Sequence, residues 1–371
     1  MGEKKALRRN PRIEALRLIA IAGIAVFHTF QPWFDAATSG AWPASPLTLV
    51  ALGLISLLGA YGNHVFFLIS GYFLMPRAAQ AAAAVTEAET AASNQTSYWR
   101  SQARSTLRRA LPILATVLFY AVVALAVSTW ITPIPSVSLT QTGWLVGGLQ
   151  FIWVYLAVVV ATPVMGWVWA RVRRPHVIVG ALVAIVFVVN AYIAFVSPGD
   201  EARGLLEWRK LMSAASYLVA FLAGGALAER PLSHPGRLLG GCTAVALVTE
   251  GAAGITTNLA LLEALSFKST SLVSFALAVA SLGVAAQARE EKPGRAARIA
   301  CELTGSILGF YVAQSMFSQL WHPMANELCA AAGAYGDAAL LAAGIAASLV
   351  FLACVLVVDR AVRIPLLRLI K

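Results

Sequence analysis

The sequence contains few charged residues: Asp, Glu, Lys and Arg together make up 12% of 371 positions, whereas 59% of the positions are hydrophobic. A soluble domain of this size surrounds its core with a charged surface, so the composition excludes an ordinary soluble fold. Acidic residues are scarcer than basic ones, and the formal net charge is +11. The basic residues occur in short runs between apolar segments rather than on one face, so they do not indicate a nucleic-acid-binding surface.

Cysteine and histidine are also scarce, with four and five residues respectively. The cysteines are widely spaced and show neither paired metal-ligand spacing nor a disulfide framework. We therefore expect no metal site and assign the cysteines no chemistry. The chain also contains no phosphate-binding glycine loop and no internal repeat. The cysteines are Cys242, Cys301, Cys329 and Cys354.

Apolar windows of about 20 residues, the length that spans a bilayer, predict ten transmembrane helices. Lys and Arg are concentrated in alternate connections, which places both termini in the cytosol. The fold class expected is therefore all-α and polytopic, a single domain over residues 1–371 with a cytosolic loop at 76–109 and no appended soluble domain. The expected spans are 13–34, 47–75, 110–130, 146–170, 177–196, 213–229, 238–262, 271–288, 299–321 and 338–358.

The first apolar segment carries three ionisable residues. Eleven helical steps separate Arg17 from His28 and return to nearly the same azimuth, and Glu14 lies one turn before Arg17. Ionisable groups within a span are costly unless they face a polar interior, so three aligned ones indicate a site. The alternative is an anchor, in which Glu14 and Arg17 pair at the cytosolic interface and His28 is a satisfied polar residue.

The cytosolic connection 76–109 is the longest between spans. Its alanine-rich part, 78–92, is either a surface helix or a loose linker. Its second part is basic, and Arg104 and Arg108 lie one helical turn apart on one face, followed by Arg109. These arginines either anchor the chain beside anionic lipid or form a landing place for a polyanionic ligand.

Two further polar residues lie within expected spans or beside them. Glu250 lies near the centre of the seventh span, where a carboxylate is costly, and is either protonated and hydrogen-bonded or part of a site. His322 precedes Pro323 at an outer helix end, and we expect it to be solvated.

Four stretches resemble the acyltransferase-3 family of integral membrane O-acyltransferases. The resemblance covers the whole chain, because ten spans with both ends in the cytosol also agree with the family. One difference is that Gln314 stands where many members have histidine. The four stretches are RIEALR at 12–17 with His28, FFLISGYFL at 66–74, RRALP at 108–112 and GFY at 309–311.

The resemblance implies transfer of an acyl group, acetyl in the first instance, from cytosolic acyl-coenzyme A to a hydroxyl. His28 would be the general base, and Arg17 would hold a phosphate or polarise the thioester. Glu14 would keep Arg17 in position. The other candidate substrate-binding residues are Arg104, Arg108, Arg109, Phe67, Ser70, His64, Glu250 and Tyr311.

The family's acceptors are mostly cell-surface glycans, so the expected partners are acyl-coenzyme A, a glycan or other hydroxyl acceptor, and membrane lipid. The expected location is a bacterial plasma membrane, which the chain crosses many times. Two alternatives remain at this stage: a polytopic transporter of a glycan or small anion, and an N-acyltransferase that acts on an amino sugar.

Overall fold

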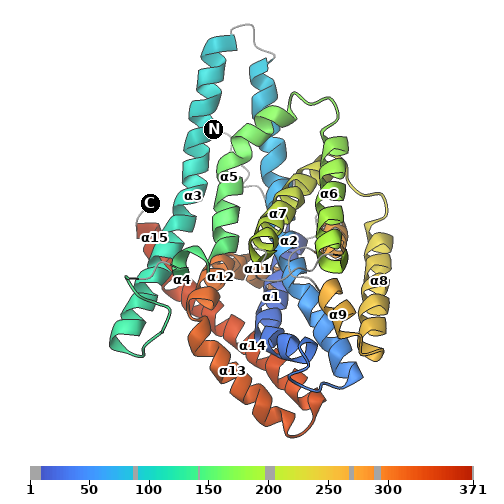
Figure 1. The fold of residues 1–371 in the computed structure, drawn as a ribbon. Coiled ribbons are helices and arrows are strands. Elements are labelled where there is room, and N and C mark those ends of the chain that lie inside the picture. The colour runs from blue at the N-terminus through green and yellow to red at the C-terminus, as the bar shows by residue number, and fades with distance from the viewer. Residues whose placement is uncertain are drawn as a thin grey trace.

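The computed structural model describes residues 10–86, 91–140, 143–196, 205–266, 271–287 and 294–369, and this part of the chain is all-helical, as predicted (Figure 1). Element η1 is a π-helix and η4 is a 3₁₀-helix. In chain order the elements are α1 (Pro11–Thr38), α2 (Pro46–Thr86), α3 (Ala91–Trp130), α4 (Gly143–Val146), α5 (Gln150–Trp169), α6 (Pro175–Ala191), η1 (Tyr192–Val196), α7 (Leu205–Glu229), α8 (Pro235–Ile255), α9 (Leu259–Leu265), α10 (Leu272–Ala286), α11 (Arg295–Leu303), η4 (Thr304–Ser306), α12 (Ile307–Met316), α13 (Ser318–Gly333), α14 (Asp337–Ala361) and α15 (Arg363–Leu369).

Eight helices in the described ranges are long and apolar enough to cross a membrane: α1, α2, α3, α5, α6, α7, α8 and α14. Helix α10 is apolar but shorter. The expected ninth span, 299–321, is divided among α11, η4, α12 and the start of α13. The count of ten and the cytosolic position of both termini therefore stay predictions. Arg203 and Lys268, two of the few outer-loop basic residues, lie outside the described residues.

Helix α2 is the centre of the bundle and packs against α1, α5, α7, α8 and α10. Its crossing with α7 depends on two glycines. A Cβ on Gly71 would lie 1.7 Å from the carbonyl oxygen of Phe221, and a Cβ on Gly224 would lie 2.0 Å from that of Leu68. Small residues allow two helix backbones to touch in a membrane, so these positions bring α2 and α7 into direct contact.

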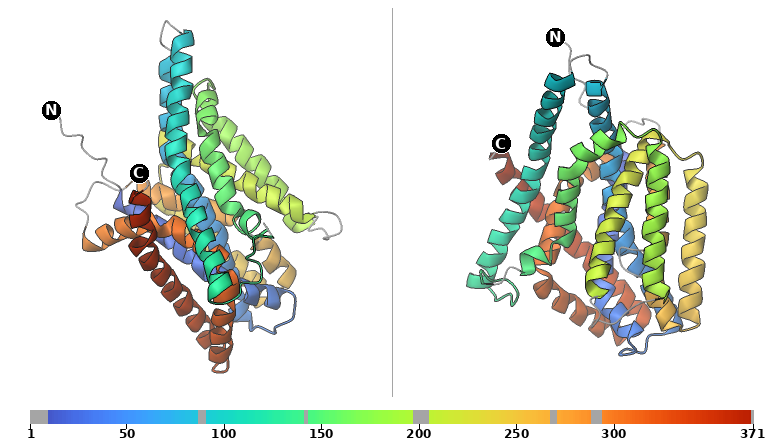
Figure 2. Two further views of the ribbon diagram at one scale, coloured as in Figure 1. Left: turned by 90° about the vertical axis from the view of Figure 1, so that its left-hand side faces the viewer. Right: turned by 45° about the horizontal axis from the view of Figure 1, so that its top comes forward.

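The end of α2 and the start of α3 project beyond the other helices as a hairpin (Figures 1 and 2). The connection 76–109 is thus helical on both sides of 87–90, and residues 78–86 continue α2 rather than forming a loose linker. We call this end of the bundle the hairpin side. Helix α13 lies toward the other end, which we call the opposite side (Figure 1).

An aromatic cluster joins the base of the hairpin to α5. The hydroxyl of Tyr98 donates a hydrogen bond of 2.8 Å to the carbonyl oxygen of Pro163. The rings of Tyr98 and Trp99 pack on Trp167, with centroids 5.1 and 5.4 Å away. The guanidinium of Arg171 lies 3.4 Å above the Trp167 ring, a cation–π contact. The cluster therefore fixes α3 beside α5 where α3 enters the bundle.

Candidate functional site

Helix α1 begins in a way that positions its first ionisable pair. Asn10 caps the helix, because its side chain accepts a hydrogen bond of 3.0 Å from the backbone nitrogen of Arg12. One turn later both carboxylate oxygens of Glu14 lie 3.2 Å from Arg17 Nη1. Glu14 is 5% exposed, so the carboxylate is buried against its partner. The predicted pair therefore forms, and it holds the guanidinium of Arg17 in one direction.

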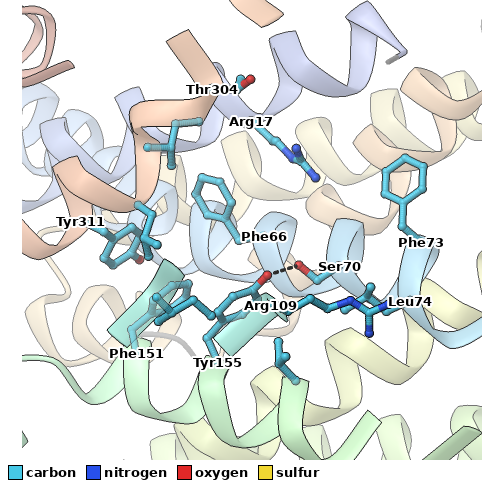
Figure 3. A pocket seen from close by; sticks show the side chains of 14 residues that line it. Arg17, Phe66, Ser70, Phe73, Leu74, Arg109, Phe151, Tyr155, Thr304 and Tyr311 are labelled. Atoms are coloured by element: carbon cyan, nitrogen blue, oxygen red, sulfur yellow. Dashed lines mark hydrogen bonds between the residues drawn. The ribbon is translucent and has the colours of Figure 1, made fainter. Parts of the chain in front are cut away.

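A cavity of about 430 Å³, which we call the central cavity, lies between α1, α2, α3, α5 and α12 (Figure 3). This volume is within the range of ligand sites in proteins. The side chains come from helices far apart in sequence, so the site exists only in the folded bundle. Its lining residues are Arg17, Phe66, Ser70, Phe73, Leu74, Arg109, Ile113, Phe151, Tyr155, Val159, Thr304, Ile307, Leu308 and Tyr311.

Positive charge is gathered at the end of the central cavity near Leu74, where the guanidinium groups of Arg17 and Arg109 lie (Figure 3). Within the described residues Arg109 forms no ion pair, and the ion pair of Arg17 is with Glu14. Between the two arginines the hydroxyl of Ser70 donates a hydrogen bond of 3.2 Å to the hydroxyl of Tyr155. This end of the cavity can therefore bind an anion and also offers hydroxyl groups.

The other end of the central cavity is aromatic (Figure 3). The rings of Phe151 and Tyr311 are stacked, with centroids 4.2 Å apart and planes 10° apart, and Phe66 meets Tyr311 edge-on at 6.1 Å. The hydroxyl of Tyr311 donates a hydrogen bond to Asn63 Oδ1. Asn63 Nδ2 donates another, of 2.9 Å, to the hydroxyl of Tyr217. Side chains from α2, α5, α7 and α12 are thus held together at this end.

A buried ionic network joins α3, α14 and α15 and packs against α12. Arg363 Nε and Nη2 lie 2.5 and 2.7 Å from the two carboxylate oxygens of Asp359. The hydroxyl of Tyr120 donates to Asp359 at 2.7 Å, and Arg363 Nη1 donates to Thr116 at 3.0 Å. A Cβ on Gly309 would lie 1.7 Å from Asp359 Oδ1. Gly309, in the GFY motif, therefore lets the network contact α12 just before Tyr311. Nothing in the sequence singles out the pair Asp359 and Arg363.

Four of the candidate residues meet in the central cavity: Arg17, Ser70, Arg109 and Tyr311. Glu14 lies directly behind them through its contact with Arg17. These residues come from all four stretches that carry the family resemblance. Their assignment as substrate-binding residues stays a prediction.

Arg104, Arg108 and His28 are not among the residues that line the cavity. Arg104 and Arg108 are exposed on one face of α3, whereas Arg109, the next residue along the helix, is half-buried and faces the cavity. His28 is half-buried farther along α1, with its ring against Phe27 at 5.0 Å. The structure therefore separates the predicted base from the predicted anion site.

His64 and Phe67 lie within the bundle rather than on the cavity surface. His64 is fully buried and meets the rings of Phe275 and Tyr217 edge-on at 5.5 and 6.2 Å. Phe67, also fully buried, stacks on Tyr217 at 4.8 Å. Of the two adjacent phenylalanines, Phe66 lines the cavity and Phe67 packs behind it against Phe151.

Glu250 lies on α8, 1% exposed, away from the central cavity. Its carboxylate packs against α2 where a glycine leaves room, since a Cβ on Gly53 would lie 2.4 Å from Glu250 Oε2. Glu250 and the arginines therefore do not share one site. Within the described residues no three His, Cys, Asp or Glu side chains gather closely enough to hold a metal ion.

His322 was expected to be solvated, but the structure places it in α13 beside α1, half-buried. Its Nε2 is buried and has no hydrogen-bond partner in the described part of the chain. Its ring lies 3.9 Å from that of Trp321. The expectation was wrong because α13 folds back against the bundle. The sequence also gave no signal for Tyr155, Phe151 and Thr304, since a hydroxyl or a ring within a span looks the same whether it faces lipid or a cavity.

Comparison with known proteins adds one finding about the chain. A family model described as an acyltransferase domain matches residues 10–359, which is nearly the whole chain. No curated protein matches the sequence, and no solved structure matches it.

Proposed function

We propose that this chain, which belongs to the acyltransferase-3 family, moves an acyl group from a cytosolic coenzyme A thioester to a hydroxyl of a cell-surface or exported glycan. The family match agrees with the four motifs and makes the protein a membrane acyltransferase in general terms. The donor, the acceptor and the roles of individual residues are the content of the proposal. A transporter is no longer needed to account for the ionisable groups within the spans.

The observation that carries the proposal is the polarity of the central cavity. Arg17 and Arg109 face one end, and Glu14 compensates only one of these two charges. Ser70 and Thr304 add hydroxyl groups, and the rest of the lining is apolar or aromatic. A coenzyme A thioester has the same polarity, with phosphates at one end and a thin arm that carries an uncharged acyl group at the other. In this arrangement the phosphates lie with the arginines and the acyl group points toward Tyr311.

The hairpin side faces the cytosol in this proposal, because the basic residues predicted to be cytosolic include Arg109 and its exposed neighbours on α3. Coenzyme A thioesters are made in the cytosol, so the donor enters beside the hairpin. The acceptor enters from the opposite side, where His28 and His322 lie on contacting helices. The protein would reside in a bacterial plasma membrane.

The chemistry requires one proton acceptor. Neutral His28 takes the proton of the acceptor hydroxyl as its oxygen attacks the thioester carbon. The carbon–sulfur bond breaks, an ester bond forms, and coenzyme A leaves as a thiol with the proton returned by His28. Arg17 lies on the same face of α1 and stabilises negative charge on the donor.

Mass spectrometry of surface glycans tests this function directly. Cells that express the protein should carry glycans heavier by one or more acyl groups, and cells without it should not. His28→Ala should remove the difference, since loss of a general base lowers the rate by about two to four orders of magnitude. His234→Ala, at an exposed histidine before α8, is the matched control and should keep it. Identical glycans in all cells would refute the acceptor assignment, and full activity of purified His28→Ala would refute the base.

A further inference from the structure

The central cavity stops short of His28. A Cβ on Gly62 would lie 2.5 Å from the side chain of Ile24, so Asn63, the next residue of α2, lies at the level of Ile24. Arg17 lines the cavity two turns nearer the hairpin side, and His28 lies one turn farther from it. One turn is about 5.4 Å along the axis. Because Asn63 binds the hydroxyl of Tyr311, the aromatic end of the cavity lies between Arg17 and His28.

Contacts with neighbouring helices hold the two rings at this aromatic end in place. Phe151 and Tyr311 are stacked at 4.2 Å, a favourable arrangement of two aromatic rings. The hydroxyl of Tyr311 is bonded to Asn63, which is bonded in turn to Tyr217. Phe67 packs edge-on against Phe151 at 5.2 Å from behind. Neither ring can therefore turn aside without breaking contacts with another helix.

Polar groups resume on the far side of the two rings. Gln314, one turn after Tyr311 on α12, has a buried Oε1 without a hydrogen-bond partner among the described residues. His28 and His322 lie there on contacting helices, and Nε2 of His322 is buried without a hydrogen-bond partner in the described chain. Along the bundle the two arginines of the cavity come first, the stacked pair Phe151 and Tyr311 follows, and the two histidines come last.

We infer that Phe151 and Tyr311 are positioning residues that form a partition between the acyl donor and His28. The inference rests on the proposed function. While the rings are stacked, the thioester in the central cavity is screened from water that enters on the acceptor side. When the acceptor is bound and the rings separate, the thioester meets the hydroxyl that His28 deprotonates. The partition therefore favours transfer over hydrolysis, in which water adds to the acyl carbon and releases a free acid and the thiol.

The first test measures both products with purified protein in proteoliposomes, using acetyl-coenzyme A as donor. Without an acceptor, the wild-type protein should release thiol slowly. Phe151→Ala should release thiol and acetate several-fold faster while its transfer to the acceptor falls. Phe187→Ala is the matched control, because it removes a buried ring on α6 outside the central cavity. It should leave the ratio of hydrolysis to transfer unchanged even if it lowers thermal stability.

Tyr311→Phe provides a milder variant in case Phe151→Ala does not fold. It keeps the stacked ring and removes only the hydroxyl that binds Asn63. We expect the same shift toward hydrolysis, smaller in size. An unchanged ratio of hydrolysis to transfer in both folded variants would overturn the partition.

A second test does not require turnover, so it separates this inference from the proposed function. In a background with the native cysteines replaced, Ser70→Cys places one thiol in the central cavity. A membrane-impermeant maleimide should label it from the hairpin side only, and Phe151→Ala should add labelling from the opposite side. Labelling from both sides with Phe151 intact would overturn the inference. One-sided labelling in a protein that transfers no acyl group would keep the partition and refute the function. The native cysteines are Cys242, Cys301, Cys329 and Cys354.

Discussion

Alanine at Gly71 should separate α2 from α7, whereas the same change at Gly180 should be harmless. A Cβ on Gly71 would lie 1.7 Å from the carbonyl oxygen of Phe221, and ordinary contact begins near 3.4 Å. The obstacle is backbone, which cannot rotate away as a side chain does. The two helices must therefore move apart by more than 1 Å, and Ser70, the preceding residue, must move with them.

The expected size follows from two opposing terms. Overpacking costs about 1–3 kcal/mol, and a backbone clash belongs near the upper end of that range. Replacing glycine by alanine within a helix contributes up to about 1 kcal/mol in the other direction. Gly71→Ala should thus lower the free energy of unfolding by about 2 kcal/mol. A Cβ on Gly180 in α6 meets nothing within 4 Å, so Gly180→Ala should be neutral or stabilising by up to about 1 kcal/mol.

Thermal unfolding of the two variants in one detergent, followed by size-exclusion chromatography, measures the difference. Donor turnover should fall in Gly71→Ala and not in Gly180→Ala, because only the first change displaces a residue of the cavity. If Gly71→Ala proves as stable as Gly180→Ala, the close approach of α2 and α7 is wrong, and the position of Ser70 must be reconsidered with it.

Three further predictions concern individual charges. Arg17→Lys keeps the charge but removes the planar fork, so calorimetry should show weaker acyl-coenzyme A binding; unchanged affinity would leave Arg17 as a partner of Glu14 only. Arg109→Glu should raise the KM for the donor more than Arg108→Glu, because only Arg109 lines the cavity; equal effects would assign both residues to topology or to a general surface charge. Asp359→Asn should lower the free energy of unfolding by about 3–5 kcal/mol, because it leaves a buried guanidinium unpaired, and a wild-type Tm would contradict the ionic network.

The sequence predicted which segments are helical better than where each helix begins and ends. Apolar windows locate segments that can enter a bilayer, and eight such helices are present in the described residues. The window 299–321 does not form one continuous helix, because such a window measures apolar content and does not detect where a helix is interrupted. Thr304, Gly305 and Ser306 form a 3₁₀ turn there, which separates α11 from α12.

The candidate site was predictable where a motif carried it and not where packing decided it. Arg17, Ser70 and Tyr311 belong to stretches that resemble the family, and all three line the central cavity. Adjacent residues on a helix point about 100° apart, so nothing local distinguishes Arg108 from Arg109. Only the packing of α3 against α5 and α12 turns Arg109 inward. The same limit applies to His64, whose aromatic neighbours lie on helices that the sequence cannot place.

The crowding around α2 bears on how such a protein can diversify. In α2 72% of the most apolar segment is buried, compared with 22% in α8 and in α14. Successive faces of α2 are occupied by neighbouring helices and by the cavity, so few of its positions can change without a compensating change elsewhere. Changes in specificity should therefore arise in elements with free surface, such as α13, whose Met324 and Leu328 are exposed. An evolving or engineered variant would keep the sequence of α2 and change residues on the opposite side of the bundle.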